Sequence, residues 1–276
     1  MVSKPNVLSN YREHGYAVLK AAIEPSVIVA VRDEIQSIFR PLLAHYQIDN
    51  GGAVGPAFDV ALGELFRRDM DGYLAAAKAT QLCPRLHNLG SGELMVDLVK
   101  SFGIERPIIA VRPVVHIVSD ALQVPGGYHR TPPHQDWRSV QGSLDALVVW
   151  LPLVEVSQQF GALEVLPGSH RRGLLKTRPD PFGNVVDESQ LEEDQFIPVA
   201  VELGDAVVFS MFTVHRTGIE QRPGIRWAVS LRYNNAVASD FVEHRYPNPF
   251  VYRSQDALLV EGYPTQRDIQ QVFDPE

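Results

Sequence analysis

The sequence predicts a mainly β protein with flanking helices, in which a double-sheet jelly roll or a barrel forms the core. Amphipathic helical patterns are confined to residues 1–106, and from Pro107 onward short runs of β-branched and aromatic residues follow one another, separated by Gly and Pro. Many short strands at this spacing are typical of such folds, and amphipathic helices beside them pack on the outside of a sheet. With 276 residues, 45% of them hydrophobic, the chain can bury this core as a single domain, 1–276.

The N-terminal part, 1–106, is expected to contain a small strand after Gly15 and then three helical stretches. The first begins after Glu24-Pro25-Ser26 and is ended or kinked by Pro41. The second runs from Ala57 to about Thr80 and the third from Leu94 to about Phe102. In each stretch apolar residues recur near the helical period, which predicts one face packed on the core.

The core, 107–235, is expected to contain short strands that begin and end at Gly and Pro turns. The predicted strands are Ile108–Val118, Ser143–Leu153, Ala162–Leu166, Gln195–Val201, Ala206–Ser210 and Arg226–Tyr233. The longest irregular segment is 171–194, which is either a solvated loop or a lid over the mouth of a pocket. The remainder, 236–276, is expected to wrap the surface as a C-terminal extension.

Composition and charge argue against several classes of function. The formal net charge is −8, and no Lys/Arg-rich run is present, so we expect no nucleic-acid partner. We find neither a signal-peptide pattern nor an apolar run long enough to span a membrane, so we expect a soluble, cytoplasmic protein without a membrane partner. Cys83 is the only cysteine, which excludes an internal disulfide and a thiolate zinc cluster and predicts a buried apolar residue.

One short motif places two metal-binding side chains close together. His134 and Asp136 stand two residues apart at a probable strand end, where residues i and i+2 point to the same face. Because the chain has 9 His, such a pair can occur by chance, so a third ligand is needed to support it. His215 is the candidate, and two histidines with one carboxylate hold non-haem Fe(II) with three coordination positions open.

These residues resemble the phytanoyl-CoA dioxygenase family of Fe(II)- and 2-oxoglutarate-dependent oxygenases. The resemblance covers most of the chain, and the segments that carry it are His14-Gly15-Tyr16-Ala17-Val18-Leu19, His134-Gln135-Asp136, Trp150, Leu166-Pro167-Gly168-Ser169-His170, Gly204-Asp205-Ala206-Val207-Val208-Phe209, His215, Gly218 and Arg226. The spacing from His215 to Arg226 matches the family's spacing between the distal histidine and the arginine that binds the cosubstrate.

The resemblance implies a double-stranded β-helix, the cupin-like jelly roll, with N-terminal helices packed on one sheet. It implies that His134, Asp136 and His215 are the catalytic iron ligands and that Arg226 pairs with the distal carboxylate of 2-oxoglutarate. A guanidinium suits this role because its planar fork can grip a carboxylate with two hydrogen bonds. Thr217 matches a family Ser/Thr whose hydroxyl supports the same carboxylate.

Three further residues are candidates for the cosubstrate site. Gln135 and Trp150 match family positions that border the cosubstrate, although Trp150 also lies in an apolar run and is expected to pack in the core. His116 shares a strand face with Arg112 and Val114. If that face points inward, His116 could hydrogen-bond the cosubstrate or the substrate; otherwise it is a structural histidine.

The reaction implied by the resemblance consumes O2 and 2-oxoglutarate, releases succinate and CO2, and hydroxylates an unactivated C–H bond. Retention of Asp136 favours this outcome over halogenation. We expect a small polar metabolite as substrate, with Arg138, Ser139 and Gln141 as candidate contacts. An acyl-CoA is less favoured as substrate, because only the basic residues within 171–178 could receive its phosphates. The alternatives are a same-fold metalloenzyme that does not use 2-oxoglutarate and a catalytically silent jelly-roll binding protein, and neither would need Arg226 together with Thr217.

Overall fold

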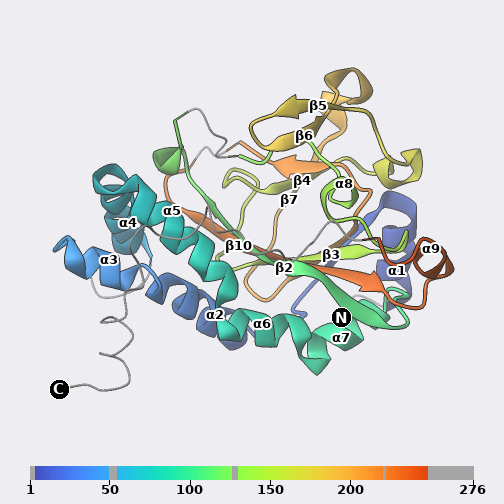
Figure 1. The fold of residues 1–276 in the computed structure, drawn as a ribbon, viewed down its shortest axis with the longest axis horizontal. Helices are drawn as coiled ribbons and strands as arrows, with labels where there is room; N and C mark the ends of the chain where they lie inside the picture. Colours follow the sequence, from blue (N-terminus) through green and yellow to red (C-terminus); the bar gives the residue numbers. More distant parts are fainter. Residues whose placement is uncertain (1–3, 50–54, 126–129, 220–221, 248–276) are drawn as a thin grey trace, which may run out of the picture.

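Two antiparallel sheets face one another in the computed structural model, which describes residues 4–49, 55–125, 130–219 and 222–247 (Figure 1). The larger sheet has the order β1-β8-β3-β10-β2, with bounds Tyr16–Leu19, Ala206–Ser210, Leu147–Pro152, Arg226–Asn235 and Pro107–Val118. The smaller sheet has the order β7-β4-β9, with bounds Ile197–Val199, Leu163–Val165 and His215–Thr217. This is the predicted jelly roll with flanking helices.

The helices α2 to α7 pack on the outer face of the larger sheet, and α2, α6 and α7 lie along it in Figure 1. The helices are α1 (Lys4–His14), α2 (Pro25–Ser37), α3 (Arg40–His45), α4 (Pro56–Arg68), α5 (Met70–Ala79), α6 (Pro84–Ser91), α7 (Glu93–Lys100), α8 (Trp137–Val140) and α9 (Ser239–Glu243). Short 3-10 turns accompany them at Thr80–Leu82, Asp120–Leu122, Ser169–Arg172, Glu188–Gln190 and Glu193–Gln195. Within the described ranges no helix has the length and apolar character that crossing a membrane requires.

Between Ala57 and Ser91 the helical layer differs from the prediction in two places. The stretch expected from Ala57 to Thr80 is two helices, because Asp69 ends α4 and caps α5 by accepting the backbone N–H of Gly72 at 2.9 Å. The helix α6 was not predicted; it begins at Pro84, which is compatible with the first turn of a helix. Cys83, just before it, is buried as expected.

Strand β10 packs against the helices with one face and lines the space between the two sheets with the other. All ten of its residues are buried. Trp227, Val229 and Leu231 pack with the helices, whereas Ala228 packs between the two sheets. The same face of β10 also carries Arg226, Ser230 and Arg232, so three polar side chains enter the space between the two sheets. Buried charges require partners or a function there.

The segment 171–194 is more regular than predicted. It contains a hairpin of β5 (Thr177–Asp180) and β6 (Gly183–Val186), which lies beside the smaller sheet in Figure 1. Val186 is fully buried, and its N–H donates to the carbonyl of Pro133 at 2.9 Å. The hairpin was missed because prolines and charged residues interrupt the alternation of apolar side chains that reveals a strand.

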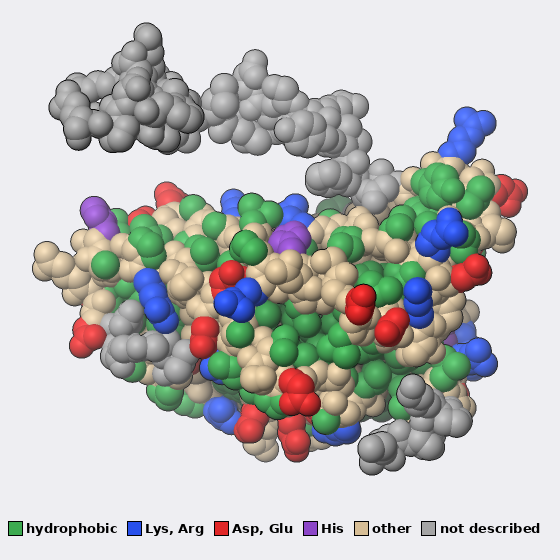
Figure 2. Space-filling model, turned by 90° about the horizontal axis from the view of Figure 1, so that it is seen from below, with side chains coloured by type: hydrophobic (Ala, Val, Ile, Leu, Met, Phe, Trp, Pro, Cys, Tyr) green, Lys and Arg blue, Asp and Glu red, His purple; other side chains and the backbone are tan. Residues whose placement is uncertain are grey.

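The outer surface of the helical layer is seen in Figure 2, from the side on which α2 and α7 lie in Figure 1. Acidic and basic side chains are scattered over it among apolar ones (Figure 2). Val27 of α2 and Leu94 of α7 are 42% and 53% exposed. Most of the predicted C-terminal extension, residues 248–276, lies outside the described residues.

Candidate metal centre

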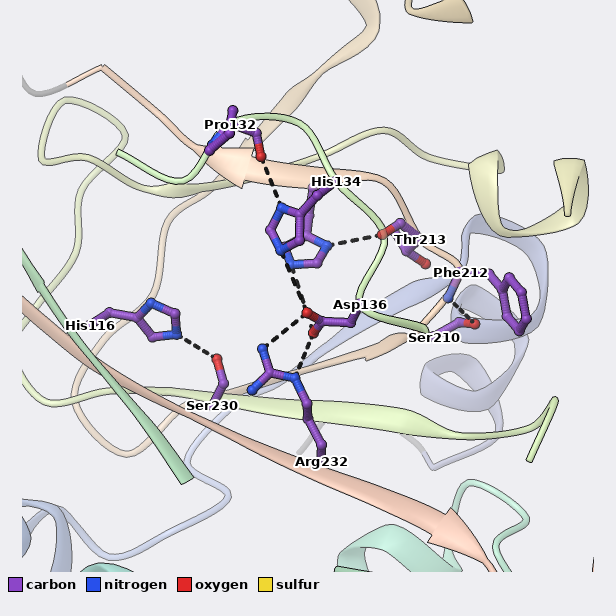
Figure 3. A network of polar contacts seen from close by, with 10 residues as sticks. His116, Pro132, His134, Asp136, Ser210, Phe212, Thr213, Ser230 and Arg232 are labelled. Carbon is purple, nitrogen blue, oxygen red and sulfur yellow. Dashed lines mark hydrogen bonds and ion pairs between the residues drawn. The ribbon is translucent and has the colours of Figure 1, made fainter. Parts of the chain in front are cut away.

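The three predicted metal ligands converge inside the jelly roll. One ligand atom from each of His134, Asp136 and His215 lies within 4.8 Å of the others, and all three residues are buried. Asp136 Oδ1 is 3.5 Å from His134 Nε2, and Asp136 Oδ2 is 4.0 Å from His215 Nε2. Figure 3 shows His134 and Asp136 pointing toward one another.

Backbone pairing brings the two histidines together. His134 and His215 form an isolated antiparallel bridge, in which the N–H of each donates to the carbonyl of the other at 3.1 Å. Asp136 does not continue an extended strand as expected; the chain turns after His134, and Asp136 becomes the N-cap residue of α8. The turn, rather than the two-residue period of a strand, directs its carboxylate to the histidines.

Both histidines present Nε2 to the centre. The Nδ1–H of His134 donates to the carbonyl of Pro132 at 2.9 Å, and the Nδ1–H of His215 donates to the carbonyl of Thr213 at 3.0 Å. Such bonds fix the tautomer and orientation of a metal-binding imidazole. Burial, followed by the nearby His134, lowers the pKa of His215 to about 3, so the ring is neutral at neutral pH, as a ligand must be. The set of two imidazole nitrogens and one carboxylate oxygen therefore fits Fe(II).

Arg232 completes the centre, and the sequence analysis did not identify it. Its Nε donates to Asp136 Oδ2 at 2.9 Å and its Nη2 to Oδ1 at 3.0 Å (Figure 3). Burial alone would raise the pKa of Asp136, but the Arg232 guanidinium and a hydrogen bond with His134 hold it well below its ordinary value. The available signal was a second arginine at an inward position of the strand that carries Arg226.

A narrow cavity leads away from the metal centre and brings several predicted residues together. His116, Trp150, Thr217 and Arg226 all line it, as do the unpredicted Ser230 and Arg232. Arg226 is 2% exposed, and its Nη2 lies 3.5 Å from Thr217 Oγ1. The guanidinium carbon of Arg226 lies 5.6 Å from the centre of the Trp150 ring. The cavity therefore has two of the predicted metal ligands, His134 and His215, and the Arg226 guanidinium on its walls.

The inward face of β2 is the one that carries His116. Val115 and Ile117 pack toward the helical core, while His116 Nε2 lies 2.7 Å from Ser230 Oγ in the cavity (Figure 3). Burial, followed by the charges of Arg226 and Arg232, lowers the pKa of His116 well below its ordinary value. A neutral imidazole at this place can exchange hydrogen bonds with a ligand.

Besides the metal-binding candidate Asp136, four predicted contacts to the cosubstrate or the substrate do not line the cavity. Gln135 donates from Nε2 to the carbonyls of Gly173 and Phe212 at 2.8 and 2.7 Å, and its Oε1 accepts the N–H of Leu175 at 2.8 Å. Gln135 thus ties the chain before β5 to residues 133–136, which carry two of the candidate metal ligands and are called the metal loop below. These contacts favour a structural role for Gln135 over the predicted contact with the cosubstrate. Arg138 donates to the carbonyl of Leu175 at 2.7 Å, Ser139 is exposed, and Gln141 has a left-handed backbone with φ 55°.

Comparison with known proteins gives three findings. The family model described as Phytanoyl-CoA dioxygenase (PhyH) matches residues 11–227. The 1-deoxypentalenic acid 11-beta-hydroxylase of Streptomyces exfoliatus is 28% identical over 117 residues, which are 38% of this chain and 41% of that protein. The peroxisomal phytanoyl-CoA dioxygenase of Homo sapiens is 30% identical over 118 residues, which are 39% of this chain and 34% of that protein. The matches thus span less than half of either relative.

A solved structure shows the same fold. It is that of the epimerase SnoN in complex with Fe3+, alpha ketoglutarate and nogalamycin RO, with a TM-score of 0.56. The sequence identity is 19%, and the superposition covers 84% of this chain and 84% of that chain. At this identity the likeness concerns the arrangement of sheets and helices.

Proposed function

Because the chain belongs to the phytanoyl-CoA dioxygenase family, we propose that it is a dioxygenase that depends on Fe(II) and 2-oxoglutarate. The resemblance stated from the sequence is thereby confirmed at the level of the family. The observation that carries the proposal is the buried cluster of His134, Asp136 and His215 beside a cavity that also exposes Arg226.

In this proposal His134, Asp136 and His215 hold the iron. When bound, Fe(II) supplies, with 2-oxoglutarate and O2, the oxidising power to hydroxylate an unactivated C–H bond while succinate and CO2 are released. The chain's own contribution is to keep the His215 imidazole neutral and the Asp136 carboxylate ionised. It also excludes bulk water from a centre whose three ligands are each at most 6% exposed.

The cavity walls suit a dicarboxylate with one end at the metal. Arg226 would grip the distal carboxylate with its planar fork, and the Thr217 hydroxyl beside it would donate to the same group. Trp150 provides a flat apolar wall for the aliphatic middle of the cosubstrate. His116 on β2 and Ser230 on β10 offer further hydrogen-bonding groups for the cosubstrate or the substrate.

The β5–β6 hairpin is proposed as the cover of the metal centre. Phe182, at its turn, places its ring 4.8 Å from that of His134, with an interplanar angle of 66°. Gln135 and Val186 attach the two sides of the hairpin to the metal loop. A cover fastened in this way would shield the centre from water during the reaction.

The substrate proposed is a small polar metabolite rather than an acyl-CoA. The basic residues within 171–178 are the candidates for binding CoA phosphates, but three of them are engaged elsewhere. Arg171 donates to the carbonyl of Arg12 at 2.8 Å, Arg172 to that of Gln190 at 2.8 Å, and Arg178 to the carboxylate of Glu188 at 3.1 Å. Arg138, Ser139 and Gln141 remain candidate substrate contacts that only a bound substrate would test.

An anaerobic titration of the Fe(II)-loaded protein with 2-oxoglutarate tests the function. A 2-oxo acid that chelates ferrous iron produces a weak visible charge-transfer band, and we expect it to saturate at one equivalent. Succinate release with candidate metabolites then identifies the substrate class. Iron binding without the band would leave the three ligands in place and favour a same-fold metalloenzyme, and failure to bind iron would favour a binding protein.

A further inference from the structure

Arg232 and Asp136 form a fork-to-fork ion pair within the jelly roll. Both donors of the guanidinium approach the outer end of the carboxylate, with Nε 2.9 Å from Oδ2 and Nη2 3.0 Å from Oδ1. The two side chains are 8% and 6% exposed, so water does not compete for these bonds. A metal ion chelated by both oxygens of Asp136 would have to lie beyond the two oxygens. The guanidinium of Arg232 already fills that space.

The sides of the carboxylate remain available to a metal. Oδ1 is 3.5 Å from His134 Nε2, and Oδ2 is 4.0 Å from His215 Nε2. An ion that contacts both imidazoles can therefore bind one oxygen of Asp136 while the other stays hydrogen-bonded to Arg232. Figure 3 shows the carboxylate of Asp136 between the histidine side and Arg232.

The backbone of β10 is irregular where it presents Arg232. Its register with β2 shifts between Ser230 and Arg232, and again between Arg232 and Tyr233. Such irregularities often stand next to active sites, where they re-aim a side chain. Three polar residues of this strand line the cavity: Arg226, Ser230 and Arg232. The register shifts lie on both sides of Arg232.

We propose that Arg232 is a positioning residue that restricts Asp136 to binding the metal through one oxygen atom. This inference rests on the proposed function, because restricting Asp136 to one oxygen matters only if 2-oxoglutarate and O2 also bind the metal. A one-oxygen carboxylate with two imidazoles leaves three coordination positions, two for the 2-oxo acid and one for O2. A chelating carboxylate would fill one of these positions. Arg232 would thus leave open a coordination position that O2 requires.

The test uses nitric oxide as a stable probe of that position. The Fe(II)- and 2-oxoglutarate-loaded protein is titrated with nitric oxide without O2, and the paramagnetic resonance signal of the complex is followed. We expect Arg232→Gln to require about 10- to 100-fold more nitric oxide than the wild type, the range typical when a group that orients a metal ligand is lost. Arg232→Lys, which keeps the charge but cannot fill both sides of the carboxylate end, should give an intermediate value.

A control variant and the charge-transfer band of the wild type distinguish a failure of this inference from a failure of the proposed function. Lys20→Met removes the cation that pairs with the buried Asp205 at 2.7 Å, away from the metal centre, and should leave the nitric oxide requirement unchanged. If Arg232→Gln does not fold, Arg232→Lys carries the test, and wild-type behaviour of the folded variant would overturn the inference. If the wild type shows no charge-transfer band with 2-oxoglutarate, the proposed function fails first. A normal band in the wild type with an unchanged nitric oxide requirement in both variants overturns the role of Arg232 alone.

Discussion

His134 and His215 are paired through their own backbones, although they lie far apart in the sequence. Each N–H donates to the other's carbonyl at 3.1 Å, and the two ring centres are 4.2 Å apart. The separation of the imidazoles is therefore set by main-chain hydrogen bonds and does not require a metal. A change of either side chain leaves these bonds in place, so the metal centre can be altered without dismantling the fold.

Replacing a metal ligand should abolish iron binding while the protein stays folded. We expect His134→Ala and Asp136→Ala each to lose tight, stoichiometric Fe(II), as measured by metal analysis after anaerobic loading and desalting. Circular dichroism should remain that of the wild type. His45→Ala, at an exposed position of α3, is the matched control and should retain iron. Stoichiometric iron in both ligand variants would refute the assignment of this centre.

Replacing Arg226 should weaken the binding of 2-oxoglutarate. Arg226→Lys replaces a planar fork with one ammonium, so two parallel hydrogen bonds to a carboxylate cannot form. We expect the 2-oxoglutarate concentration at half saturation of the charge-transfer band to rise by at least about tenfold, which corresponds to about 1.4 kcal/mol. Arg67→Lys, on the exposed face of α4, should not change it. An unchanged requirement in Arg226→Lys would assign the carboxylate to another residue.

Loss of the Gln135 amide should loosen the segment before the hairpin. In Gln135→Leu the carbonyls of Gly173 and Phe212 and the N–H of Leu175 lose a partner in a largely buried environment, at a cost of about 2 kcal/mol in the free energy of unfolding. Chemical denaturation should measure this loss, and hydrogen exchange should accelerate in 171–194. The 2-oxoglutarate requirement should stay near that of the wild type. The opposite result, normal stability with a raised requirement, would restore the predicted contact with the cosubstrate.

The buried His116 should make the metal-free protein less stable in mild acid. Its pKa in the folded state lies well below the ordinary value of 6.5, so below pH 6.5 the unfolded chain takes up a proton that the folded chain does not. The stabilising contribution is complete well above pH 6.5 and decreases by about 1.4 kcal/mol for each pH unit between 6.5 and the lower pKa of the folded state. Denaturation of the wild type and of His116→Gln at pH 7.5 and 5.5 measures the difference. An equal loss in both proteins would show that His116 does not carry this dependence.

The sequence by itself named His134, Asp136 and His215, the three residues that converge in the structure as a candidate metal centre. His134 and Asp136 stand two residues apart, and Arg226 and Thr217 have a characteristic spacing from His215, so no knowledge of the fold was needed to name them. The bounds predicted for β8, Ala206–Ser210, are those in the structure, since an uninterrupted apolar run between turn residues is also a local signal. The family followed from the order of these motifs along the chain.

Tertiary structure alone decided which other polar residues reach the centre. Arg232, on the inward side of β10, meets Asp136 at the start of α8, and the register of β10 with β2 shifts on both sides of Arg232. Gln135, one residue from two metal ligands, turns instead to the chain before β5. Strand pairing joins residues that are distant in sequence, and a one-residue change in register moves a side chain to the other face of the sheet. A sequence pattern fixes neither the partner nor the face, so these contacts required the folded chain.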